Sequence, residues 1–213
     1  YCASLKLCAL VRLWGCHSQA RSLLYVLIMA SKKKTYKQIL DPVIDPKTKQ
    51  MDVGGLLIPP TSLITALLYG FAHHTHAKAK EYYFWKVCDE LWNHVDLPEQ
   101  LMVRHPWAEE MIRCAIENKY LAIGGSASSG KSHTMAAWGI VNWLSQPKDT
   151  LVLMTSTTLR EARKRIWGSV MSLLTVIEGA PVKIRDSIGN AAYVDEKGTL
   201  IERAGLSLIS AEK

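Results

Sequence analysis

An eight-residue run from Gly125 to Ser132 has the residue types and spacing that bind phosphate groups. It reads Gly-Ser-Ala-Ser-Ser-Gly-Lys-Ser and fits the pattern G-x-x-x-x-G-K-[ST], whose glycines let successive backbone N–H groups curl around an anion. The lysine of such a loop reaches the β- and γ-phosphates, and the hydroxyl after it ligates Mg²⁺. The run therefore predicts an ATP and Mg²⁺ site in which Lys131 and the Ser132 hydroxyl contribute to catalysis. The expected nucleotide contacts are Gly125, Ser126, Ala127, Ser128, Ser129, Gly130, Lys131, Ser132 and His133.

A second segment with chemical potential follows at 155–165. Thr158 and Glu161 form a capping box that predicts a helix beginning at about Leu159. An arginine in the first turn of a helix opposes the helix dipole unless an anion compensates it. Arg160 and Arg163 are therefore candidate contacts to nucleotide phosphate or to the DNA backbone, with plain surface charges as the alternative. Arg165 is instead expected to pair with Glu161 across one helical turn.

The loop needs elements that hold it in place. Residues 120–124 are predicted to form a short buried strand and 150–155 a second one, with a helix starting at the lysine between them. Strand, helix and strand at this spacing predict a parallel crossover unit. Before it, a proline in the first turn, early acids and a late lysine predict a helix over 106–119.

The remaining chain divides into a helical part and a part with short strands. Apolar residues three and four apart predict helices over 63–71 and 84–95, after a turn-rich lead-in at 41–60. We expect their aromatic residues to form a helix core, with a base-stacking platform as the alternative. An apolar stripe predicts one continuous helix from Leu159 to Ile177, and beyond Pro181 come short strands at 182–184, 192–194, 200–201 and 206–209. The expected fold class is α/β: a P-loop NTPase core with a mostly parallel sheet flanked by helices, and a helical N-terminal subregion.

Composition narrows the class of protein. The 213 residues are 48% hydrophobic and 21% charged, which excludes disordered and collagen-like chains. The net charge of +7 is compatible with a polyanionic partner. No apolar run reaches the roughly 18 residues of a membrane span. Five scattered cysteines indicate reduced thiols, and His73, His74 and His76 are expected to be solvated residues rather than metal ligands.

The N-terminal 28 residues differ from the rest. They contain no acidic residue and three of the five cysteines, and Met29 follows them with a small residue and a lysine run after it. We expect residues 1–28 to be upstream sequence translated in frame. A signal peptide is the alternative, although its charged run would follow the apolar region instead of preceding it. The expected organisation is then 1–28, a lead-in and helical subregion at 29–104, and a partial P-loop ATPase domain at 105–213.

Together, these motifs resemble the large subunit of tailed-bacteriophage terminases, over about 106–213. The resemblance lies in the His105-Pro106-Trp107 helix start, the run 124–132, and the segments 154–160 and 165–168. The 205–212 segment is similar to the one that leads to the family's Walker B motif. The resemblance implies an ATPase that drives duplex DNA into a procapsid in the host cytoplasm. It also implies a homo-oligomeric ring, with the portal protein and the small terminase subunit as partners and no membrane.

The chain departs from this family at two places. The family often has an adenine-binding glutamine in the helix before the loop, where this chain has Trp107-Ala108-Glu109, and an arginine within the loop, where it has residues 126–129. An arginine from the second segment, acting on a neighbouring subunit, would be one substitute. Neither Walker B nor the family's nuclease acids can be placed, so we expect little ATP hydrolysis from residues 1–213. The alternatives are a helicase-like P-loop ATPase and a nucleotide-binding module without turnover.

Overall fold

The computed structural model describes residues 39–93, 99–126, 129–156 and 158–210. The chain separates into two compact units, Tyr1–Ile39 and Leu40–Lys213. Every described residue except Ile39 belongs to the second unit. The expectation for residues 1–28 lies outside the described residues.

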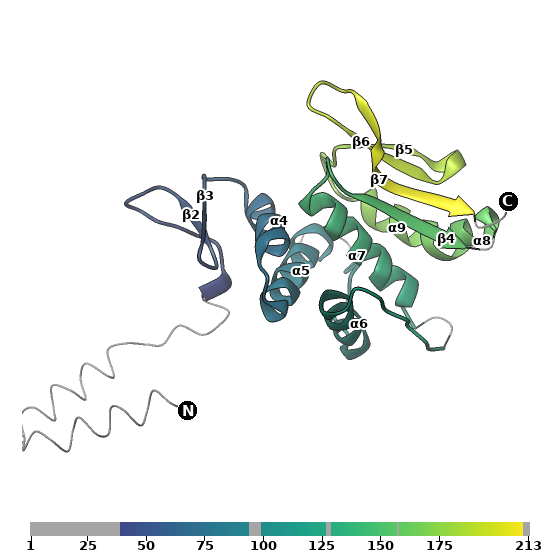
Figure 1. Ribbon diagram of the computed structural model, residues 1–213, viewed down its shortest axis with the longest axis horizontal. Coiled ribbons are helices and arrows are strands. Elements are labelled where there is room, and N and C mark those ends of the chain that lie inside the picture. Colours follow the sequence, from purple (N-terminus) through teal and green to yellow (C-terminus); the bar gives the residue numbers. More distant parts are fainter. Residues whose placement is uncertain (1–38, 94–98, 127–128, 157, 211–213) are drawn as a thin grey trace, which may run out of the picture. The chain divides into compact units, whose positions relative to one another are not determined.

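The second unit begins with a small antiparallel sheet. Its strands β1 (Val43–Ile44), β2 (Met51–Val53) and β3 (Leu56–Ile58) are neighbours in chain order (Figure 1). The β2–β3 turn consists of Gly54 and Gly55, with φ of 61° and 94°, values that glycine adopts without a steric penalty. Only turns were predicted here, because strands of two and three residues are too short to show a period.

Two helices follow and confirm the helical N-terminal subregion: α4 (Leu63–His73) and α5 (Ala77–Trp92). Ser62 caps α4, since its Oγ accepts a hydrogen bond from the Thr65 N–H at 3.2 Å. The largest aromatic side chains of α5 are buried: Tyr83, Phe84, Trp85 and Trp92 are each no more than 1% exposed. They form a helix core, as expected, and present no open platform to bases.

The two helices that flank the phosphate-binding motif are also confirmed. Helix α6 spans Pro106–Glu117 and α7 spans Lys131–Ser145. Pro106 is in the first turn of α6, and the His105 Nδ1 atom caps that turn by accepting from the Trp107 N–H at 3.2 Å. One face of α7 is fully buried, with Ala137, Ile140, Val141 and Trp143 inaccessible to solvent.

A second sheet lies beside α7 (Figure 1). It contains β4 (Leu151–Ser156), β5 (Val182–Arg185), β6 (Asn190–Val194) and β7 (Leu200–Ser210), in the order β4-β7-β6-β5. Strands β4 and β7 are parallel, while β7 with β6 and β6 with β5 are antiparallel. The two strands expected at 200–201 and 206–209 are one continuous strand. The chain therefore has a mixed α/β fold, and its four-stranded sheet is mixed rather than mostly parallel.

The predicted strand at 120–124 does not form. Residues 121–126 have no regular structure, and Tyr120 is 83% exposed. None of the described strands pairs with these residues, although β4 is an edge strand whose described partner is β7. An extended segment without a neighbouring strand has no ladder to stabilise it. The expected crossover between 120–124 and 150–155 is thus corrected to a parallel pairing of β4 with β7.

The helix that begins at Leu159 is interrupted. Its start is as predicted, because the Thr158 Oγ1 atom accepts from the Glu161 N–H at 3.2 Å. It then continues as α8 (Leu159–Ala162), a π-helix (Arg163–Trp167) and α9 (Gly168–Leu174). The wider π turn shifts the buried face, which becomes Trp167, Val170, Leu173 and Leu174. Val170 and Leu173 of the predicted stripe are buried, and Leu159, Ile166 and Ile177 pack against the core. The prediction of one continuous helix to Ile177 was wrong, because a π-helix interrupts it and α9 ends at Leu174.

Candidate functional site

The phosphate-binding motif ends on a left-handed glycine at the start of α7. Gly130 has φ 75° and ψ 1° and is the N-cap of the helix. A Cβ atom there would meet nothing within 4 Å, so the backbone conformation alone requires glycine. Within the described residues, no side chain caps α7. The backbone N–H groups of its first turn therefore point toward the inside of the loop, and so does the positive end of the helix dipole.

Lys131 folds its side chain over the loop that precedes it. Its Nζ atom donates to the carbonyl oxygen of Gly125 at 3.0 Å and to the Ser129 Oγ atom at 2.8 Å. It also donates to the carbonyl oxygen of Ser126, and Ser129 Oγ donates to that same oxygen at 3.0 Å. An ammonium group has three donors, and all three point into the loop. The positive charge predicted to meet phosphate thus lies inside the loop.

The other predicted contacts of the motif fall into three groups. Ser132 is half-buried in the first turn of α7, next to Lys131. The His133 ring nitrogen Nε2 donates to the carbonyl oxygen of Leu101 at 2.7 Å, so this imidazole ties α7 to the segment before α6. Ala127 and Ser128 lie outside the described residues.

Two cavities that described residues line adjoin the loop. The first has a volume of about 240 Å³ and the second about 280 Å³. Trp107 and Ser129 line both of them. The first is lined by Trp107, Met111, Ile123, Gly124, Gly125, Ser126, Ser129 and Lys131. The second extends toward the residues before α6 and includes His105 and His133. Four of the motif residues therefore surround one cavity whose other wall is apolar.

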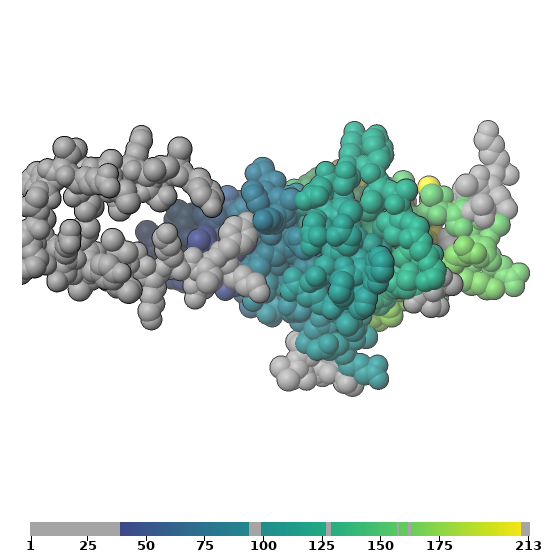
Figure 2. Space-filling model, turned by 90° about the horizontal axis from the view of Figure 1, so that it is seen from below, coloured from purple at the N-terminus to yellow at the C-terminus, as the bar shows by residue number. Residues whose placement is uncertain are grey.

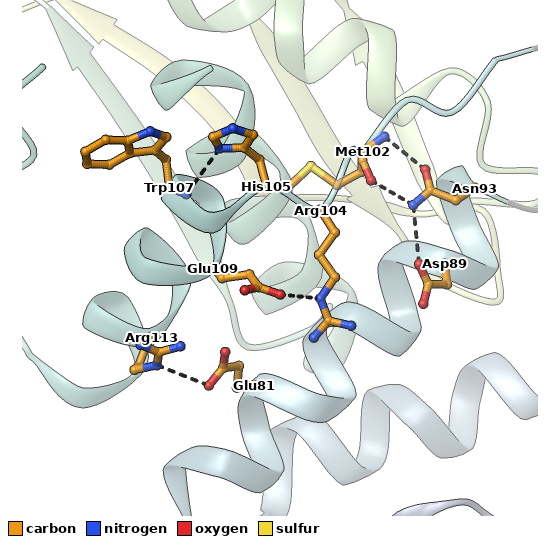
Figure 3. Close-up of polar contacts among 9 residues, drawn as sticks. All are labelled: Glu81, Asp89, Asn93, Met102, Arg104, His105, Trp107, Glu109 and Arg113. Carbon is orange, nitrogen blue, oxygen red and sulfur yellow. Dashed lines mark hydrogen bonds and ion pairs between the residues drawn. The ribbon is translucent and has the colours of Figure 1, made fainter. Parts of the chain in front are cut away.

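Polar contacts hold the Trp107 side of these cavities in place (Figure 3). The Asn93 side chain brackets Met102, donating to its carbonyl oxygen at 2.7 Å and accepting from its N–H at 3.1 Å. Arg104 Nε donates to Glu109 Oε1 at 2.8 Å across the start of α6. These contacts fix where α6 begins, and hence where Trp107 stands.

Trp107 itself is left open. Its side chain is 71% exposed, and its indole projects away from the Arg104–Glu109 pair (Figure 3). Figure 2 views the molecule from the side on which α6 lies, and the teal atoms of this region stand at the front of the described part. In the sequence, Trp107 stood out as part of the helix start on which the resemblance rests, in the segment where the family often has a glutamine. Its position directly after Pro106, on the helix before the motif, was the available signal.

The two candidate arginines are not among the described residues that line either cavity. Arg160 lies exposed on α8, and Arg163 is half-buried at the start of the π-helix. The Nε atom of Arg163 is buried and, within the described residues, has no hydrogen-bond partner. Arg165 pairs with Glu161 at 3.1 Å, as predicted. Contact of Arg160 or Arg163 with a phosphate therefore stays a prediction.

Neighbouring groups of the protein contact the histidines His73 and His74 and the carboxylate of Asp195. His73 packs on Tyr69 with ring centroids 4.1 Å apart, and His74 donates from Nε2 to the carbonyl oxygen of Val53 at 3.0 Å. Among the described residues, no group of three or more His, Cys, Asp or Glu side chains could hold a metal ion. Asp195 accepts from the N–H groups of Lys197 and Thr199, so Asp195 and Glu196 lie in a turn.

Comparison of the chain with protein-family models, with curated proteins and with solved structures finds no match. In the part of the chain that the structure describes, no helix is both long enough and apolar enough to span a bilayer.

Proposed function

We propose that this chain binds Mg²⁺·ATP at Gly125–Ser132 and is the ATPase portion of a nucleic-acid motor of the terminase large-subunit type. The observation that carries the proposal is the position of the Lys131 ammonium inside a loop that ends on a left-handed glycine, at a helix start that no described side chain caps. The charge of the lysine, the backbone N–H groups of the loop and the helix dipole would then all favour binding of an anion at the same point.

Binding of a triphosphate would exchange the partners of Lys131. Its ammonium is bonded to neutral oxygens of Gly125, Ser126 and Ser129. Phosphate oxygens carry full negative charge and form stronger, charge-assisted hydrogen bonds with an ammonium group. Ser132, one residue further along the same helix turn, is the hydroxyl that would hold Mg²⁺. That ion would neutralise charge on the phosphate oxygens.

The assignment to a packaging motor, as opposed to any other P-loop ATPase, rests on the family resemblance of 106–213. Two further features support a polyanionic partner: the net charge of +7 and the exposed Arg160 near the C-terminal end of β4. In parallel sheets ligands gather at that end of the strands.

Titration calorimetry with Mg²⁺·ATP tests the nucleotide site. We expect Lys131→Ala to weaken binding about 10- to 100-fold, the effect of losing a hydrogen bond to a charged group. Lys148→Ala is the matched control, because Lys148 pairs with Glu196 at 3.5 Å and lines neither cavity. Equal ATP affinity of the wild type and Lys131→Ala would contradict the proposal.

A further inference from the structure

The cavity of about 240 Å³ beside the loop is lined by residues of two kinds. The motif residues Gly125, Ser126, Ser129 and Lys131 contribute backbone polar groups, hydroxyl groups and an ammonium group. Trp107, Met111 and Ile123 contribute apolar side chains. The ligand that matches such a cavity has an anionic part joined to a flat apolar part. A cavity this size is slightly below the roughly 300–1,000 Å³ of small-molecule pockets, so it suits part of a nucleotide rather than the whole.

Trp107 is the residue that a flat ligand would contact. An exposed indole leaves a large apolar surface in water, and stacking against a base would bury part of it. Its backbone is fixed by the His105 cap, and the adjoining segment by the Asn93–Met102 contacts. On the other side, the bond from His133 to Leu101 ties the first turn of α7 to the same segment. Both walls are thus attached to one framework.

The described polar side chains of this cavity belong to the phosphate-binding motif. Ser129 Oγ and Lys131 Nζ bond to one another and to loop carbonyls. None of the described side chains that line it is an amide, carboxylate, guanidinium or imidazole. A site rejects a ligand strongly when its buried polar side chains are left unpaired by that ligand. The described apolar residues that line this cavity contribute no buried polar side chain that a base would have to pair.

We infer that Trp107 binds the base of the nucleoside triphosphate by stacking, in a cavity whose described side chains do not distinguish adenine from guanine. This inference rests on the proposed function, because it requires the triphosphate to occupy the loop. It assigns Trp107 a role in affinity and gives the site little selectivity between purines.

Calorimetry on the full chain with Mg²⁺ tests this with three ligands: ATP, GTP and inorganic tripolyphosphate. We expect ATP and GTP to bind with affinities within about threefold of one another. Trp107→Ala should weaken both nucleotides about 10-fold, the usual effect of removing an aromatic partner from one base, while Trp107→Phe retains most of the affinity. Tripolyphosphate has no base, so Trp107→Ala should leave its affinity unchanged. Tyr120→Ala is the matched control, since Tyr120 is 83% exposed and lines neither cavity.

The possible outcomes distinguish failure of the inference from failure of the proposed function. If wild-type chain binds neither tripolyphosphate nor nucleotide, the proposed function fails and the inference with it. If it binds tripolyphosphate and Trp107→Ala leaves nucleotide affinity unchanged, the inference alone is overturned. A preference above about 10-fold for ATP over GTP also overturns it. If His105→Ser then abolishes that preference, the base lies in the second cavity, beside the imidazoles.

Discussion

The ammonium of Lys131 lies 3.0 Å from the carbonyl oxygen of Gly125, six residues earlier in the chain. This contact joins the lysine to the first residue of the phosphate-binding loop. We predict that Lys131→Met increases hydrogen exchange at the amides of Gly125, Ser126 and Ser129 about 10-fold, because each charge-assisted bond contributes about 1.5–3 kcal/mol. Lys148→Met should leave these amides unchanged. Unaltered exchange in Lys131→Met would show that the contact does not order the loop.

The left-handed conformation of Gly130 gives a second prediction. Alanine at this position should lower the free energy of unfolding by about 1–2 kcal/mol, the cost of placing a Cβ at positive φ. The space around it is open, so no clash adds to this value. Gly168, at the start of α9, is equally open and lacks a positive φ, so Gly168→Ala is the control and should be neutral or slightly stabilising. Urea denaturation measures both, and equal effects would contradict this explanation.

Two buried tryptophans of α5 differ in one hydrogen bond. The Trp92 Nε1–H donates to the carbonyl oxygen of Leu173 in α9 at 2.9 Å, whereas Trp85 Nε1 is buried without a partner in the described part of the chain. We predict that Trp92→Phe is more destabilising than Trp85→Phe by about 1–2 kcal/mol, because only the first leaves an acceptor unpaired. Both substitutions remove a similar volume from the core. Denaturant unfolding of the two variants would refute this if Trp85→Phe were the more harmful.

Arg160 is the exposed candidate for a DNA contact. If it binds the DNA backbone, Arg160→Ala should weaken duplex binding uniformly across sequences. It should also reduce the slope of log affinity against log salt by about 1. Arg165→Ala is the matched control, since Arg165 pairs with Glu161. Fluorescence anisotropy over a salt series measures the slope, and equal slopes for the two variants would leave Arg160 as a surface charge.

Asp45 provides a prediction about pH. The Lys47 N–H at 2.8 Å and the Thr48 hydroxyl at 2.9 Å hold the pKa of Asp45 below its usual value, since both donate to the carboxylate. A carboxyl group whose pKa is lower in the folded than in the unfolded chain stabilises the fold above its unfolded pKa. That stability is lost as the pH falls through the folded pKa. Asp45→Asn should therefore destabilise the protein at pH 7 and have less effect near pH 2. A carbon-detected NMR titration of Asp45 would disprove this if its pKa were normal.

Parts of the fold could be read from single residues. Pro106 and the following acids predict α6, and the motif itself predicts that a helix starts at Lys131, because these signals act within one turn. Residues 120–124 could not be placed the same way. An apolar run indicates that a strand could form, but whether another strand pairs with it depends on residues distant in sequence, and none of the described strands does. The π-helix at 163–167 could not be predicted either, because the apolar pattern was interpreted with the α-helical period throughout.

Only part of the candidate site could be predicted from the sequence. Gly130 and Lys131 follow from the motif, since the loop is local in sequence. The apolar wall at Trp107 does not, because contacts that are distant in sequence set its position. Asn93 holds Met102, and His133 reaches back to Leu101. No spacing along the chain reports that these residues meet.

The strand order of the second sheet has a consequence for how the chain folds. Strands β5, β6 and β7 pair in succession through short turns, so each pairing closes a short loop. Strand β4 pairs with β7 across more than 50 residues, as Leu151 opposite Gly205 shows. Closing a longer loop loses more chain entropy, which slows contacts between residues far apart in sequence. We therefore expect the meander to assemble early and β4 to join it last, so that this sheet grows from its later strands toward its first.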